Sequence, residues 1–538
     1  MERPSQRLRE KPVLPRGEEE QPVIAAPPVP EAAPPARDAG PPILHLKRVK
    51  LEGNTVFSNE ELAAITGRYE GKDVTADDLR QLRQDLTLHY IQHGYINSGA
   101  VLPEQSVQDG ELRIKIVEGR LTEVQIEGLD HLREFYLRPR IARDAQEKPL
   151  NVKELQENLQ LLQQSQLIKR INAELAPGLK PGEAILRARV EEARPYFLTL
   201  GYNNDGVPSV GAEGFEVWAG HRNLFGVGDQ FDGNFNLTEG QEQYEFDYAL
   251  PFTPWDTALK LRYQHSEAHV VEEPFDQLNI FNQSETFGVG VFQPVWKSLE
   301  NTVTLGVIAE RRHSKAFLLD EPFPFSRGAD DQGVSNVSVL RFGQDWLNRT
   351  ENRVIALRSV ANWGVDVLDA TVHEGGDFVP DGRYFFWLGQ AQWIQRLWDT
   401  GIEMHLTGNV QLTGDQLLSL EQYALGGMYS VRGYRKNQVV RDSGYATSLE
   451  FRIPILKSQM GEGVMHFTPF FDFGGAWNVN FPTDHPHTLA SAGLGLHFDP
   501  ARAWHVEFYW ARPIVKVENN GHDLQDSGVH FAVNFSPF

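Results

Sequence analysis

The most specific chemistry in this chain lies in four consecutive residues, Val431, Arg432, Gly433 and Tyr434, which follow the pair Gly426-Gly427. The guanidinium group of an arginine can satisfy a carboxylate through two parallel hydrogen bonds. An arginine between a β-branched residue and a glycine-tyrosine pair also costs little to leave in solvent. By itself, the segment is therefore equally consistent with an ordinary loop tip, and its meaning depends on the elements around it.

Catalytic motifs are missing from the sequence. It has no Walker-type glycine loop, no His-Glu-x-x-His, no Gly-x-Ser-x-Gly, and no cysteine for a thiolate or a cysteine-ligated zinc site. His265, His269, His485 and His487 are scattered, and we expect them to be solvated in hydrophilic loops. The sequence therefore predicts that the protein is not an enzyme, and that it has no cofactor and no catalytic or metal-binding residues.

Composition favours a β-rich envelope protein. The 538 residues include 47 Gly, 31 Phe, 15 Tyr and 11 Trp, and no window approaches the ~18 consecutive apolar residues of a membrane-spanning helix. The mean hydropathy of −0.40 does not exclude a transmembrane β-barrel, because its strands alternate apolar and polar residues. The net charge of −22 argues against nucleic acid as a partner, since phosphate contacts require a basic face.

Residues 1–41 form a proline-rich segment that we expect to be a disordered linker. Eleven of the 32 prolines lie between Pro4 and Pro42, with few bulky apolar residues among them. Such a segment buries too little apolar surface to offset its ordering entropy. The first four residues are followed by no apolar run, so no secretory signal is recognised there.

A mixed α/β pattern then occurs twice, in residues 42–119 and again in residues 120–194. Two strand sequences recur between the copies. The pairs are residues 49–53 with 124–128 and residues 112–118 with 185–191, at spacings of 75 and 73 residues. We therefore predict two copies of one α+β module.

Helix signals stand between the paired strands of each copy. Ser58 precedes Glu61, and Thr75 precedes Asp78, at the spacing of capping boxes, and Asn151 is the expected cap in the second copy. The apolar residues at helical spacing, which we expect to be core without chemistry, are Leu79, Leu82, Leu86 and Tyr90 in the first copy and Leu155, Leu159 and Leu162 in the second. Each copy therefore reads β-α-α-β-β.

Residues 195–538 carry the alternation of a transmembrane antiparallel β-barrel. Near the end, Val529, Phe531, Val533 and Phe535 occupy every second position and so share one face of a strand. Glu507 also stands in an alternating strand, and because a carboxylate against lipid is costly, we expect it to face the lumen. At roughly 10 residues per tilted strand, this region has room for about sixteen strands. A soluble multi-sheet protein is the alternative, but it would have to cover the aromatic faces with a second layer.

The module that opens with Val-x-Leu/Ile-Glu-Gly resembles a POTRA domain, the periplasmic module of an outer-membrane transporter superfamily. Two copies followed directly by a barrel resemble the two-partner secretion transporters (TpsB type), which export haemolysins and filamentous adhesins. Residues 224–229, 412–415 and 421–427 also resemble stretches of these transporters. The resemblance implies a barrel of sixteen strands in the outer membrane and POTRA domains in the periplasm. Residues 1–41 offer no counterpart to the plug helix with which these transporters commonly begin.

The same resemblance gives the arginine motif a partner. In the superfamily, a long extracellular loop carrying Val-Arg-Gly-Tyr folds back into the barrel, where its arginine meets an aspartate in an inner-strand motif, Phe-x-Asp-x-Gly. This chain has that motif as Phe470, Asp472 and Gly474, so the resemblance implies a pair between Arg432 and Asp472. A confined lumen screens such a pair less than an open surface does. Gly433 and Gly474 would permit close backbone approach.

The function implied by the resemblance is export, without ATP, of a large secreted exoprotein that carries an N-terminal secretion domain. The POTRA domains would capture the unfolded partner by adding one of its segments to a strand edge, and the barrel, embedded in outer-membrane lipid, would conduct it. The 431–434 loop would move or brace the channel wall. An outer-membrane protein assembly or insertion factor is one rival, with many clients. A diffusion porin with a periplasmic module is another, with steady conductance.

Overall fold

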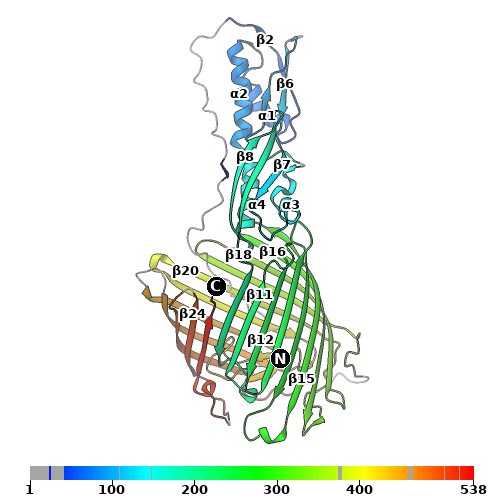
Figure 1. Ribbon diagram of the computed structural model, residues 1–538, viewed down its shortest axis with the longest axis vertical. Helices are drawn as coiled ribbons and strands as arrows, with labels where there is room; N and C mark the ends of the chain where they lie inside the picture. Colours follow the sequence, from blue (N-terminus) through cyan, green and yellow to red (C-terminus); the bar gives the residue numbers. More distant parts are fainter. Residues whose placement is uncertain are drawn as a thin grey trace. The chain divides into compact units, whose positions relative to one another are not determined.

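The computed structural model describes residues 24–25, 41–107, 109–146, 148–373, 379–457, 464–501, 503–519 and 521–537. These residues fall into two compact units, one within residues 18–194 and one that begins at Pro195 (Figure 1). In the described ranges, no helix is both long and apolar enough to cross a membrane. The linker predicted for residues 1–41 lies outside the described residues, apart from residues 24–25 and 41.

The first module is built on a three-stranded sheet in the order β3-β6-β5, in which β3 and β6 are parallel and β5 and β6 antiparallel. A second, two-stranded sheet of β2 and β4 was not predicted. The elements are β2 (Leu44–Leu46), β3 (Arg48–Glu52), α1 (Asn59–Thr66), β4 (Lys72–Val74), α2 (Ala76–Gln92), β5 (Gly99–Val101) and β6 (Glu111–Val117).

The helices of the first module begin where the sequence predicts. Ser58 and Glu61 form a capping box at α1, and Thr75 and Asp78 form another at α2. In each box, both side chains satisfy backbone N–H groups that the first turn leaves without partners. The predicted apolar face of α2 is buried: Leu79, Leu82, Leu86 and Tyr90 lie in one core with the inward residues of the sheet.

The second module repeats the same order and the same strand directions. Its elements are β7 (Arg120–Glu127), α3 (Glu134–Ala142), α4 (Val152–Gln163), β8 (Ile168–Pro177) and β9 (Glu183–Glu192). A further strand, β1 (Ile24–Ala25), pairs in parallel with the outer edge of β8. The prediction of a linker without structure was therefore wrong at these two residues, whose backbones complete an open strand edge.

The predicted N-terminal cap of helix α4 is confirmed, but one of its predicted core residues is wrong. The side chain of Asn151 accepts a hydrogen bond of 2.9 Å from the backbone N–H of Lys153. Leu155 and Leu159 are buried as predicted, but the third buried leucine is Leu161 and not Leu162.

The strand register corrects the spacing of the repeat. Val49 on β3 lies opposite Leu112 on β6, and its counterpart Val124 on β7 lies opposite Leu186 on β9. The second spacing is thus 186 − 112 = 74 residues and not 73. The difference decides which residues face the core, because a slip of one residue exchanges the two faces of a strand.

Each module closes its first loop with a glutamate from the end of its last strand. The Glu118 carboxylate accepts hydrogen bonds from the backbone of Thr55 (2.6 Å) and Val56 (2.8 Å) and from the hydroxyl of Tyr90 (2.9 Å). In the second module, Glu192 accepts from the backbone N–H groups of residues 130–132. These glutamates fix the chain between the first strand and the first helix of each copy.

We expect the first module to lose stability in acid through Glu118. Burial alone would raise the pKa of this carboxyl, but its hydrogen bonds to Thr55, Val56 and Tyr90 hold the pKa below its ordinary value of 4.5. The carboxylate therefore stabilises the fold fully above the unfolded-state pKa, and this contribution is lost as pH falls through the lower folded-state pKa. Hydrogen exchange at Thr55 and Val56 in the full-length protein should accelerate below about pH 4.5, after correction for the intrinsic rate.

The matched variants are Glu118→Gln and, as control, Glu104→Gln, which changes an exposed glutamate of the same module. Glu118→Gln should exchange faster at neutral pH and show little further change in acid, whereas the control should behave like the parent protein. Equal protection in the parent and Glu118→Gln at neutral pH would exclude this role.

The second unit is a closed antiparallel barrel in which sixteen long strands pair in sequence order and β10 pairs with β28 (Figure 1). Short β17 (Glu321–Pro322) extends only the end of β16, which pairs directly with β18. The wall strands are β10 (Tyr196–Asn203), β11 (Gly214–His221), β12 (Gln230–Thr238), β13 (Gln241–Pro251), β14 (Ala258–His269), β15 (Phe281–Lys297), β16 (Asn301–Leu318), β18 (Val334–Arg349), β19 (Arg353–Gly364), β20 (Phe385–Leu397), β21 (Ile402–Thr413), β24 (Ser443–Lys457), β25 (Val464–Trp477), β26 (Thr488–Asp499), β27 (Trp504–Pro513) and β28 (Val529–Phe535).

The predicted alternation separates the two faces of the wall. On β27, Phe508 is 43% exposed on the outer face, whereas Glu507 is 4% exposed and turned into the lumen, as expected. The connections also differ between the two ends of the barrel. Residues 298–300, 350–352 and 398–401 make tight turns at one end, the form typical of the periplasmic side, and residues 414–442 make a long loop at the other.

Candidate functional site

The candidate site is the loop of residues 414–442, which connects β21 with β24 and folds into the barrel. A short hairpin of β22 (Tyr423–Leu425) and β23 (Val439–Arg441) stiffens its base. Val431 and Tyr434 are buried in one apolar cluster with residues of this hairpin and of strands β24 to β26. The loop is thus packed against the inner wall and is part of the lumen's structure.

Arg432 and Asp472 meet on that wall. The Nε of Arg432 donates to Oδ2 of Asp472 at 2.8 Å, and Nη2 donates to Oδ1 at 2.9 Å, which is a bidentate pair. The backbone N–H of Arg432 donates to the same carboxylate at 3.0 Å. The side chains of Arg432 and Asp472 are 6% and 0% exposed, so both charges depend on this contact.

A second carboxylate and two aromatic rings complete the surroundings of the guanidinium. Its Nη1 donates to Oε2 of Glu450 at 2.6 Å, and the other Glu450 oxygen accepts from Arg452 at 2.9 Å. Two arginines therefore balance the two acids Asp472 and Glu450. The guanidinium lies 3.5 Å from the ring centroid of Phe470 and 4.6 Å from that of Tyr509, and both rings contribute cation–π contacts.

The residues after the arginine fix the loop tip by backbone geometry. Gly433 has φ +87°, and a Cβ there would lie 2.9 Å from Cβ of Ala511, so any other residue would be strained. Its N–H donates to Nε2 of His530 at 3.0 Å. The Tyr434 hydroxyl lies 2.8 Å from the carbonyl oxygen of Val515, in the connection after β27.

The inner-strand motif occupies alternate positions of β25, so all three of its residues face the lumen. Phe470 and Asp472 both contact Arg432, as described above. Gly474 has a different role, because a Cβ there would lie 2.6 Å from Cδ1 of Leu425. Its missing side chain makes room for the loop hairpin.

A second ionic network, which sequence reasoning missed, holds the base of the loop. The buried carboxylate of Glu421 accepts from Nη1 of Arg312 (2.8 Å) and from Nη2 of Arg341 (2.8 Å). Arg341 also donates to Glu310 at 2.8 Å, so this group is again charge-balanced. The sequence did contain one indication of this network. Glu310 and Arg312 stand at alternate positions of one strand, which places both side chains on the same face.

The return arm of the loop makes three further ion pairs. Arg435 donates to Asp526 at 2.6 Å and to Glu272 at 2.8 Å, and Nζ of Lys436 lies 2.9 Å from a carboxylate oxygen of Asp205. These three acids lie in other connections of the barrel. The loop is therefore fixed at its base, its tip and its return arm.

The other sequence expectations have mixed outcomes. His265 is not a solvated loop residue, because it is 9% exposed on β14 beside Glu267 and Glu285. His485 and His487 do lie in the connection between β25 and β26. Residues 224–229 lie in the turn between β11 and β12.

A duplicated α+β module joined to a closed sixteen-strand barrel, with an arginine loop paired to the inner wall, defines the class of outer-membrane transporters that combine POTRA domains with a barrel. The chain belongs to the haemolysin secretion/activation protein family ShlB/FhaC/HecB, whose model matches residues 182–498. The model of the ShlB-type POTRA domain matches residues 44–119. The protein is thus a two-partner secretion transporter of the outer membrane, in a family whose POTRA domains are periplasmic.

Curated relatives agree with this assignment. The outer membrane transporter CdiB of Dickeya dadantii is 24% identical over 417 residues, which cover 75% of this chain and 71% of that protein. The hemolysin transporter protein ShlB of Serratia marcescens is 23% identical over 480 residues, 86% of this chain and 82% of that protein.

Solved structures share the fold. CdiB from Escherichia coli superposes with a TM-score of 0.72 at 20% identity, over 94% of this chain and 92% of that one. CdiB from Acinetobacter baumannii gives a TM-score of 0.63 at 16% identity, over 96% and 94% of the two chains.

Proposed function

We propose that this transporter recognises one large, unfolded exoprotein in the periplasm through its POTRA domains and exports it through the barrel without ATP. The observation that carries the proposal is the loop of residues 414–442, a folded segment fixed inside the lumen by charged residues at three places. A diffusion porin needs no such element. A protein-conducting barrel does need one, because its lumen must be closed to other solutes while no partner is passing.

The loop contacts suit an element that changes position during transport. Ion pairs and hydrogen bonds can be remade with water or with a passing chain, whereas an interface of apolar residues alone would be costly to expose. The Arg432–Asp472 pair lies at the tip of the loop, where its release would free the segment farthest from the loop's two ends. We assign Val431, Arg432, Gly433 and Tyr434 to this loop tip, with Phe470, Asp472 and Gly474 as its receptor on the wall.

Strand addition is the recognition mode that the POTRA fold favours. The outer edge of β8 already accepts an extended segment, since Ile24 and Ala25 pair there opposite Ala173 and Glu174. Such an edge offers backbone donors and acceptors to any extended chain, and side-chain contacts then select the partner. The partner in this proposal carries an N-terminal secretion domain that engages the transporter in this way, by taking the place of Ile24 and Ala25 on β8.

The driving force needs no nucleotide in this proposal. When the exported chain folds outside the cell, its return through the barrel becomes unfavourable. A ligand that bound the chain only on the outer side of the membrane would have the same effect. Partner transport into liposomes that contain the purified protein, without ATP, measures this part separately.

Site-specific photo-crosslinking tests the recognition step. A photoreactive residue in place of Glu174, which is exposed on β8, should crosslink to the unfolded exoprotein during secretion. The matched control is Glu127, exposed on β7 at the opposite edge of the same sheet, where we expect no crosslink.

The other outcomes of this experiment distinguish the alternatives. Crosslinks from position 174 to several barrel precursors, with no secreted partner among them, would favour an insertion factor. Equal crosslinking from both edges would exclude β8 as the specific recognition strand. Steady conductance that loop variants do not change would indicate a porin.

A further inference from the structure

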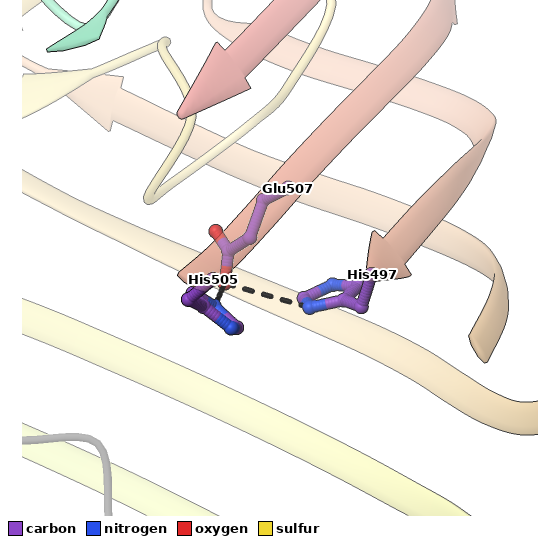
Figure 2. A group of neighbouring side chains, drawn as sticks. All are labelled: His497, His505 and Glu507. Atoms are coloured by element: carbon purple, nitrogen blue, oxygen red, sulfur yellow. Dashed lines mark hydrogen bonds and ion pairs between the residues drawn. The ribbon is translucent and has the colours of Figure 1, made fainter. Parts of the chain in front are cut away.

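Two histidines and a glutamate meet on the inner wall of the barrel, beside the network that holds Arg432. His505 and Glu507 are two residues apart on β27 and so share its inner face, and His497 on β26 lies directly opposite Glu507 in the strand register. Figure 2 shows the Glu507 carboxylate between the two imidazole rings. His497 and Glu507 are buried, and His505 is half-buried.

Two of the three donor-atom distances are close to those of a zinc site. Oε1 of Glu507 lies 3.0 Å from Nε2 of His505 and 3.5 Å from Nδ1 of His497 (Figure 2). One ligand atom from each residue falls within 4.8 Å of the other two. In a tetrahedral zinc site, bonds of about 2.0–2.1 Å place neighbouring ligand atoms about 3.3 Å apart. Two histidines and one glutamate are also a known ligand set for zinc sites that keep one open position.

Asp499 orients the His505 ring for metal binding. Its Oδ1 lies 2.6 Å from Nδ1 of His505. Because an ionised carboxylate only accepts hydrogen bonds, Nδ1 carries a proton, and the neutral ring then presents the lone pair of Nε2 toward Glu507. Metal-binding histidines characteristically donate their other N–H to a carboxylate in this way, which fixes the ring and its tautomer.

His497 is oriented by a corresponding arrangement. Its Nε2 lies 2.6 Å from the hydroxyl of Tyr509 and 3.7 Å from Oε1 of Glu450. A proton on Nε2 is donated to the Tyr509 hydroxyl oxygen and leaves the lone pair on Nδ1, the atom that faces Glu507. Both imidazoles can therefore turn a lone pair toward the same carboxylate.

We propose that His497, His505 and Glu507 bind a divalent transition-metal ion, with Zn²⁺ as the best fit, in the lumen near the end of β26 and the start of β27. The ion would replace the proton that otherwise joins Nε2 of His505 to the Glu507 carboxylate. The half-exposed side of His505 leaves room for water as a fourth ligand. Through Tyr509, whose ring lies 4.6 Å from the Arg432 guanidinium, the site adjoins the anchored loop tip.

Direct metal binding by the full-length protein tests this proposal. The purified protein, without a histidine tag and stripped by a chelator, is dialysed in detergent against Zn²⁺ and against Co²⁺. We expect one Zn²⁺ per chain and, with Co²⁺, the visible absorption of a four-coordinate nitrogen and oxygen site. Asp499→Asn should weaken binding by about 10–100-fold, as is typical when the partner of a metal-bound histidine is lost.

His497→Gln and His505→Gln should each abolish saturable binding. The matched control is His405→Gln, which removes a lumen-facing histidine 3.1 Å from Glu403 on β21, and it should bind zinc like the parent protein. The heat-dependent shift of a folded barrel in gel electrophoresis shows that each variant is folded. Absence of stoichiometric binding in the parent protein overturns the proposal, and so does binding that survives both histidine variants or depends on His485 and His487.

Discussion

Replacing Arg432 with alanine should reduce partner secretion by about tenfold or more, because removing one member of a buried ion pair costs about 3–5 kcal/mol. The variant leaves Asp472 without its bidentate partner and Glu450 with only Arg452. The loop tip then has no charged contact with the wall and should leave its resting position. The barrel strands themselves do not depend on this pair, so the variant should still insert into the outer membrane.

The measurement is the amount of exoprotein in the medium, relative to the amount of transporter in the outer membrane. Arg441→Ala is the matched control, since Arg441 lies on the same loop but donates to the carbonyl of its neighbour Val440. Secretion by the control should be normal. Undiminished secretion by Arg432→Ala would remove the loop tip from the transport mechanism.

The reversed pair separates the contact from the individual residues. Arg432→Asp and Asp472→Arg should each fail, and the double variant should recover part of the secretion if the two side chains act through each other. Full recovery is not expected, because Glu450 would then face an aspartate in place of the guanidinium it now binds. A double variant no better than either single one would show that the two residues act independently.

Replacing Glu421 with alanine is expected to open the lumen from the base of the loop. Arg312 and Arg341 would then lose the carboxylate that they share in a buried site, and the loss of such a partner costs about 3–5 kcal/mol. Because the hairpin of β22 and β23 starts two residues after Glu421, its hold on the wall should weaken. We expect a larger single-channel conductance in planar bilayers and more frequent transitions between conductance levels.

Glu267→Ala is the control for this variant, since Glu267 is a half-exposed glutamate beside His265 on β14. Its conductance should match that of the parent protein. If Glu421→Ala conducts like the parent, the loop is held by its tip and return arm alone. Combined with Arg432→Ala, the variant also tests whether the two anchors act additively, as expected for sites without shared partners.

The Glu421 network and the Arg432 network hold different parts of the loop. The Glu421 network ties the loop base to β16 and β18, whereas the Arg432 network ties the tip to β24 and β25. Both are buried and charge-balanced. Such networks are costly to break singly but can exchange partners, which suits a segment that has one resting position and must sometimes leave it.

Local patterns sufficed for much of the fold. The capping boxes of α1 and α2 and the alternation in β27 and β28 are encoded within a few neighbouring residues, so they were predictable without tertiary information. The repeat was also visible, but its second spacing was off by one residue. Sequence similarity between short β strands does not distinguish adjacent registers, and the pairing of Leu186 with Val124 does.

The candidate site also has residues that the sequence could predict and residues that it could not. The motif around Arg432 and the motif around Asp472 are both local sequences, and resemblance to a family was enough to connect them. Glu421, Arg312 and Arg341 carry no local motif, and they come together only because the loop folds back against two strands about 80 to 109 positions away in the chain.

The sequence alone therefore determined the two modules, the barrel and the identity of the loop with its wall motif, because those features follow from strand and helix periodicity and from short motifs. The tertiary structure decided which charges share a buried site. It placed Glu450 and Glu421 beside arginines, and His497 opposite Glu507, through barrel closure and strand register. Such contacts depend on long-range pairing, in which a shift of one residue would turn every side chain involved to the other face.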